Sequence, residues 1–146
     1  MALLTRHALL AILTFMFTLP YPFREQNKRL PWMQLSIAHF AFIVWQICYN
    51  WIGVQQVQHC ELFQHYFMHN CFWLGKRKTI LWRAVWCSTT WSLWCHRNRI
   101  IFYGEKLDFY SRVEQIRFKA WSWLSAKVKN FNHSFYDWYV SPMFLY

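Results

Sequence analysis

The sequence predicts a mainly α-helical protein, a small aromatic-rich domain of about four to five helices with no sheet of any size. Apolar residues recur at intervals of three and four along several segments, the spacing of one face of a helix. The 14 Phe, 11 Trp and 8 Tyr exclude a disordered linker, and the scarcity of Gly, 3 of 146 residues, excludes Gly-rich repeats and collagen. A chain of this length can bury an ample core.

The N-terminal part, residues 1–31, is predicted to be an apolar helix followed by a polar connector. The apolar run from Ala8 to Leu19 is too short to span a bilayer. It resembles the core of a secretory signal, but no small-residue cleavage site follows. We therefore expect a helix that packs on the rest and is ended by Pro20 and Pro22, with Arg24 to Pro31 as the connector. A signal or membrane anchor within residues 2–19 stays open as the alternative.

Residues 32–146 form the second predicted region, and its first helix runs from Ile37 to Val54. Six side chains at helical spacing define its apolar stripe: Phe40, Ile43, Val44, Ile47, Cys48 and Trp51. Gly53 is a suitable stop. A second helix is predicted from Gln56 to Asn70.

The third predicted helix, from about Lys78 to Ile101, has apolar residues on almost every side and should be central. Arg83 within it argues against a membrane span. Lys76, Arg83, Thr90 and Arg97 recur every seven residues and so form a narrow polar seam. The seam is either a solvated edge or a rail for phosphates, and we favour the edge.

The last predicted helix starts at Ser111, because Ser111 and Glu114 fit a capping box, or earlier, near Lys106. Its apolar stripe consists of Phe109, Val113, Ile116, Ala120, Trp123 and Leu124. The opposite face is predicted to be basic and solvated, with Arg112, Gln115, Lys119, Ser122 and Lys129. The tail from Asn130 to Tyr146 is predicted to be irregular and to fold back on the core.

The cysteines and histidines do not form a recognisable metal site. The five cysteines lack regular spacing and any Cys-x2-Cys pair, so we expect reduced thiols, an intracellular location in the nucleus or cytoplasm, and no cofactor. One dense stretch is a candidate metal site, but we do not expect it to bind a metal: His59, Cys60, His65, His69 and Cys71.

Catalytic groups are also scarce. Glu105 and Asp108 are the only close pair among six acidic residues, and they stand at a predicted helix junction where a solvated role is expected. No nucleophile-elbow pattern surrounds a serine. The sequence therefore predicts no enzyme and indicates no small-molecule substrate.

The charge points to polyanionic partners. Sixteen Lys and Arg face six Asp and Glu, and only Glu61 is charged between Leu30 and Gly75. The excess is concentrated between Lys76 and Lys129. Contact with the phosphates of RNA or DNA is predicted through ten residues: Lys76, Arg77, Lys78, Arg83, Arg97, Arg99, Arg112, Lys119, Lys127 and Lys129.

Three segments resemble the C-terminal region of plant non-LTR retrotransposon reverse transcriptases. The segment from Trp82 to Phe102 is similar to the family's helix with two tryptophans, Arg-Asn, Arg and Phe. His39 to Val54 resembles the stretch that follows the family's last zinc ligand, and Ala120 to Lys127 its closing Trp-x-Trp helix. The likeness covers about two-thirds of the chain, from Ile37 to Pro142.

The zinc ligands that the resemblance implies have no counterpart, because Ala38 and Met33 stand at their positions and no cysteine precedes Cys48. The family's polymerase and endonuclease regions are absent as well. We therefore interpret the chain as a non-catalytic, truncated and degenerate remnant that retains weak, sequence-independent nucleic-acid binding. Two alternatives stay open: a small basic protein at a membrane surface with an N-terminal hydrophobic anchor, and a gene relic without selected function.

Overall fold

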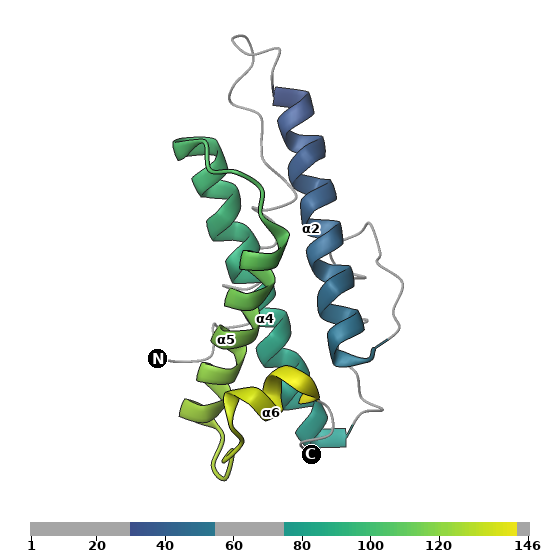
Figure 1. The fold of residues 1–146 in the computed structure, drawn as a ribbon, viewed down its shortest axis with the longest axis vertical. Coiled ribbons are helices and arrows are strands. Elements are labelled where there is room, and N and C mark those ends of the chain that lie inside the picture. The colour runs from purple at the N-terminus through teal and green to yellow at the C-terminus, as the bar shows by residue number, and fades with distance from the viewer. Residues whose placement is uncertain (1–29, 55–74, 143–146) are drawn as a thin grey trace.

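The computed structural model describes residues 30–54 and 75–142, which contain four α-helices and no strand (Figure 1). The helices are α2 (Leu30–Ile52), α4 (Gly75–Tyr103), α5 (Phe109–Lys127) and α6 (Phe135–Val140). The three long helices pack against one another, and α6 lies across the bundle near the end of α5. The predicted fold class is therefore confirmed for this part of the chain. The helices predicted before residue 20 and from Gln56 to Asn70 lie outside the described residues.

Helix α2 is the helix predicted from Ile37, but it begins earlier, at Leu30. Pro31 is compatible with this start because the amide groups of a first helical turn have no partner within the helix. Gly53 ends the helix as predicted, with a φ of 75°. The amide of Val54 then donates to the carbonyl of Tyr49 across 3.0 Å, which closes the last turn.

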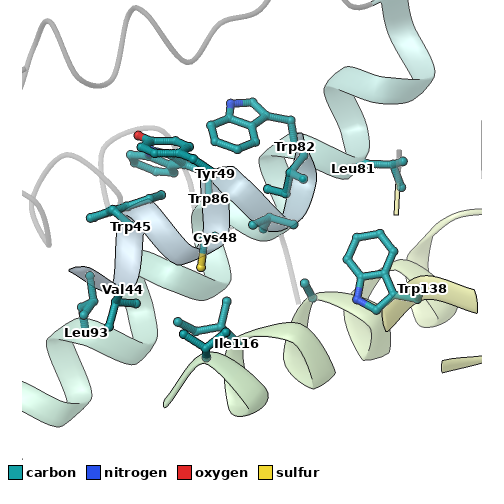
Figure 2. Close-up of a cluster of buried hydrophobic side chains, with 14 of the residues drawn as sticks. Val44, Trp45, Cys48, Tyr49, Leu81, Trp82, Trp86, Leu93, Ile116 and Trp138 are labelled. Carbon is teal, nitrogen blue, oxygen red and sulfur yellow. The ribbon is translucent and has the colours of Figure 1, made fainter. Parts of the chain in front are cut away.

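Aromatic pairs join α2 to α4. The ring of Tyr49 stacks on Trp82 with centroids 5.7 Å apart, and Trp45 lies 6.5 Å from Trp86. A later residue of α2 thus meets an earlier residue of α4, so the two helices are antiparallel. Figure 2 shows these rings gathered with the neighbouring aliphatic side chains in one buried cluster. Their burial supplies most of the driving force that assembles the bundle.

Helix α4 is the central helix that its sequence predicts. Within residues 81–93 most side chains are buried, and of the rest only Arg83 is exposed. The buried set includes hydroxyls, which bond back to carbonyls one turn earlier. Ser88 and Thr89 both donate to Val85, at 3.0 and 2.8 Å, and Thr90 donates to Trp86 at 2.8 Å. These three hydroxyls can therefore lie inside the bundle at little cost, whereas the hydroxyl of Ser92 is buried without a hydrogen-bond partner.

Cys48 of α2 lies at the same level of the core and is fully buried. Its Sγ atom is 3.8 Å from the hydroxyl oxygen of Thr89. Burial raises the pKa of the Cys48 thiol to about 11. The thiol behaves as a small apolar group, as expected for the cysteines of this chain.

Helix α5 does not begin with the predicted capping box. Asp108 is the N-cap, and its Oδ1 accepts the amide of Ser111 at 3.1 Å. Ser111 is therefore already inside the first turn, and Glu114 pairs instead with Arg117 at 2.9 Å. A carboxylate caps as well as a hydroxyl and also favours the positive end of the helix dipole. Four residues of the predicted apolar stripe are buried, Val113, Ile116, Ala120 and Leu124, and Phe109 is partly buried against the core. Trp123 was wrongly included, because Trp121 packs against the core in its place.

The predicted irregular tail contains a helix. Ser134 caps α6, and its hydroxyl accepts the amide of Asp137 while the carboxylate of Asp137 bonds the amide of Ser134. Trp138 on this helix is fully buried, and its indole donates to the carbonyl of Arg117 at 2.9 Å. The indole of Trp51 donates to Tyr139 at 2.8 Å, so α6 is bonded to both α2 and α5.

Candidate nucleic-acid interface

Eight of the ten predicted phosphate contacts can be grouped by the exposure of their side chains. Four are exposed (Arg83, Arg99, Lys127 and Lys129), two are half-buried (Lys78 and Lys119) and two are buried (Arg97 and Arg112). The side chains of Lys76 and Arg77 lie outside the described residues. The structure thus separates cations that can meet a polyanion from cations that serve the fold.

Arg112 belongs to the fold, which corrects its assignment to a solvated face. Its side chain is only 4% exposed. One terminal nitrogen donates to Gln115 at 2.9 Å, and the other lies 2.8 Å from Nδ1 of His96 and 3.2 Å from Glu105. These contacts occupy the donors that a phosphate would need. Arg112 therefore has no place in the interface.

Arg97 is likewise buried, at 7% exposure, and burial lowers its pKa. Thr90, one step back along the predicted seam, is 1% exposed. The predicted polar seam along α4 is therefore buried beyond Arg83, and it is neither a continuous solvated edge nor a rail for phosphates. A spacing of seven keeps residues on one side of a helix, but neighbouring elements decide whether that side meets water.

The connection between α4 and α5 places the carboxylate of Glu105 beside Arg112 and Arg99. Gly104 ends α4 with a φ of 65°, and its amide donates to Ile100 at 3.0 Å. The left-handed conformation turns the chain back along the helix. Glu105 consequently lies beside α4 and α5, with Oε1 3.2 Å from Arg112 and Oε2 4.0 Å from Arg99. The solvated role predicted for Glu105 is wrong, because it pairs with a buried arginine.

His96 completes the buried part of this cluster. Its side chain is 1% exposed, and its ring lies 4.9 Å from that of Phe40. An arginine can only donate, so Nδ1 of His96 is the acceptor and the ring proton is on Nε2. Burial, and then the charge of Arg112, lower the pKa of His96. The neutral imidazole is thus the form that fits between Phe40 and Arg112.

Two further cations, the exposed Arg99 of α4 and the half-buried Lys119 of α5, form what we call the α4–α5 seam, which is distinct from the polar seam along α4. The side chain of Arg99 is 56% exposed. Burial lowers the pKa of Lys119; Cys95 opposes this shift, and the charges of Arg112 and Arg99 add to it. Lys119 therefore experiences the positive potential of both arginines. An anion bound at this seam would relieve that repulsion.

Glu105 does not cancel the potential. It approaches Arg112 more closely than Arg99, so its charge mainly balances the buried guanidinium. Near the seam, Asp108 is engaged as the N-cap of α5. Lys106, which the sequence prediction omitted, is exposed in the same connection. The seam consequently keeps an excess of positive charge.

Sequence reasoning also missed His96 and Arg117 as parts of the fold. Arg117 is 14% exposed and lies over the rings of Trp51 and Tyr139, at 5.0 and 4.6 Å. For His96 a signal was present, because it follows Thr89 by two turns and Leu93 by one and therefore shares their face. No sequence signal places Arg117 between two rings that come from other helices.

Metal binding has no site in the described parts of the chain. Neither residues 30–54 nor residues 75–142 contain a group of three His, Cys, Asp or Glu side chains that could hold an ion. The candidate metal site of the sequence, from His59 to Cys71, lies outside the described residues.

Comparison with known proteins gives no relative. No family model, no curated protein and no solved structure matches this chain. Among the described helices, none combines the length and the apolar character that crossing a membrane requires.

Proposed function

We propose that this chain is a non-catalytic, retrotransposon-derived protein that binds nucleic-acid phosphates without sequence preference. The carrying observation is the α4–α5 seam, where Arg99 and Lys119 reinforce each other's potential while Glu105 balances the buried Arg112. Such a site recognises phosphate charge rather than base edges, so it carries no sequence information.

The composition and the family resemblance support the same class. A formal net charge of +10 attracts polyanions over long distances. The motifs that resemble a retrotransposon reverse transcriptase, Trp82 to Phe102 and Ala120 to Lys127, belong to the two helices that meet at the seam. Lys78, Arg83, Lys127 and Lys129 would add weaker contacts away from it.

The proposal assigns no reaction to the chain. Glu105 and His96 approach within 3.6 Å, which is longer than a hydrogen bond. Arg112 contacts Oε1 of the carboxylate and Nδ1 of the imidazole, and the remaining atoms, Oε2 and Nε2, are buried away from solvent. Neither group is therefore offered to a substrate.

Binding of labelled mixed-sequence DNA and RNA tests the proposal by fluorescence anisotropy at about 50 and 200 mM salt. We expect the affinity to fall steeply with salt, because bound cations release counterions. The double variant Arg99→Gln/Lys119→Gln should reduce the slope of log K against log salt by about 2 for duplex DNA.

The matched control is Lys127→Gln/Lys129→Gln, which removes the same charge from exposed positions at the end of α5. It should reduce the slope less. Absence of binding at low salt would refute the proposal. Flotation with anionic vesicles addresses the membrane alternative, which would replace the proposal if the chain bound vesicles and not nucleic acid.

A further inference from the structure

The last turn of α4 presents two aromatic rings to solvent. Phe102 is 75% exposed and Tyr103 is 84% exposed. Figure 1 shows this turn extending beyond the first turn of α5, so α5 leaves it uncovered. Large aromatic side chains are normally buried for their apolar area, and these two rings leave theirs in water.

The same two rings stand beside one cation of the seam. Phe102 and Tyr103 follow Arg99 by three and four residues, and side chains at these separations are neighbours on a helix surface, about 5–6 Å apart at their Cβ atoms. Arg99 is in turn coupled electrostatically to Lys119 of α5. The guanidinium of Arg99 and the two exposed rings therefore share one side of the last turns of α4, which places a phosphate-binding group next to two stacking surfaces.

We infer that this edge binds single-stranded nucleic acid, with an unpaired base stacked on Phe102 or Tyr103 and a neighbouring phosphate on Arg99. The inference rests on the proposed function and adds the class of nucleic acid to it. In a duplex the base faces are covered by neighbouring bases, so only a single strand can use the rings. Stacking is also tolerant of sequence, because every base has a π-face.

The extent of the aromatic surface favours a strand over a membrane. An interfacial helix inserts one long apolar face into the lipid. Here the most exposed rings are spread over three helices: Phe102 and Tyr103 on α4, Tyr110 and Phe118 on α5, and Tyr136 on α6. One ring and one cation are enough to hold a nucleotide.

The test compares labelled single strands and a duplex of the same sequence, using the full chain and the double variant Phe102→Leu/Tyr103→Leu. Leucine keeps helix propensity and apolar character but removes the flat ring. We expect the variant to lose about tenfold in affinity for single strands, with duplex affinity and salt slope unchanged. Tyr103→Trp combined with Phe102→Leu should restore single-strand affinity.

Tyr136→Leu on α6 is the matched control, since Tyr136 is 74% exposed and belongs to another helix. It should leave both affinities unchanged. The inference is overturned if the double variant binds single strands as tightly as the parent chain does, or if it loses single-strand and duplex affinity equally. Both results would leave the proposed function intact, whereas absence of all binding by the parent chain would refute that function itself. Vesicle binding that depends on the two rings, without an effect on single strands, would overturn the inference in favour of a lipid surface.

Discussion

Two arginines on α5 are removed from water by opposite means. Arg112 is held by a carboxylate and an imidazole, Glu105 and His96. Arg117 lies over the rings of Trp51 and Tyr139, and its one ion pair, with Glu114, is at the surface. The first arrangement, the Arg112 cluster, depends on groups that titrate. The second, the Arg117 cluster, depends on aromatic faces, which do not titrate.

The difference shows two ways in which a small helical bundle can stabilise a buried guanidinium. The attraction between a guanidinium and ring faces is worth about 0.5–2 kcal/mol and does not require the protein to bury a counter-charge. An ion pair is stronger in a buried setting but leaves a costly unpaired charge when one partner is lost. The Arg112 cluster should therefore be the more fragile of the two toward loss of its counter-charge and toward acid.

The largest effect is expected from Trp138→Ala, which breaks the support of the Arg117 cluster. Trp138 is fully buried, packs edge-on against Trp51 at 5.2 Å and bonds the carbonyl of Arg117. Its loss should lower the free energy of unfolding by about 3–5 kcal/mol in urea titrations. Tyr136→Ala, an exposed site on the same helix, should change it by no more than about 0.5 kcal/mol. Equal effects at both positions would show that α6 does not pack as described.

The second effect compares the counter-charges of the two clusters. Glu105→Gln leaves the guanidinium of Arg112 without its carboxylate and should destabilise the fold by about 1–3 kcal/mol. The value stays below that of a fully buried pair because the side chain of Glu105 is 35% exposed. Glu114→Gln at the Arg117 cluster, where the carboxylate is 49% exposed, should cost about 0–1 kcal/mol. A larger loss from Glu114→Gln would reverse the ranking of the two clusters.

The third and smallest effect is a pH dependence confined to the Arg112 cluster. Burial, and then Arg112, hold the pKa of His96 below its ordinary value of 6.5 in the folded chain. As the pH falls below about 6.5, the unfolded chain therefore binds a proton on His96 before the folded chain does. The contribution of neutral His96 to the free energy of unfolding is thus complete above this pH and decreases below it. The slope cannot exceed about 1.4 kcal/mol per pH unit, the value for one proton.

Urea titrations at several pH values below neutrality measure this slope, with His96→Gln as the comparison. Glutamine offers Arg112 an acceptor but does not titrate. The parent chain should lose more stability on acidification than His96→Gln does. Parallel losses in the two proteins would exclude His96 as the source.

The positions of the helices could be predicted because periodicity reports burial directly. The stripe of Val113, Ile116, Ala120 and Leu124 is the buried face of α5. The ends of the helices were harder to predict, because several residues near a helix start can act as the N-cap and the sequence does not show which of them does. At the start of α5 the carboxylate of Asp108 takes this role before Ser111 can. At α6 the Ser134–Asp137 box was readable in the sequence, but six residues are too few to show a period.

The interface was harder to predict, because formal charge does not reveal exposure. Arg112 precedes Ile116 by four residues and Ala120 by eight, so its position on the buried face was visible in the spacing. Arg97 gave a similar signal, since it follows the buried Leu93 by four residues, but its place in the seven-residue polar spacing favoured a solvated side. Arg99 and Lys119 could be predicted as cations, but their proximity follows from the antiparallel packing of α4 and α5 and from the turn at Gly104.

The burial of Cys48 also makes opening of the bundle measurable by chemical modification. Alkylating reagents attack the thiolate, and with a pKa of about 11 this sulfur is almost entirely protonated at neutral pH. Its modification must therefore wait until α2 separates from α4. The rate at which Cys48 is alkylated therefore reports how often the bundle opens.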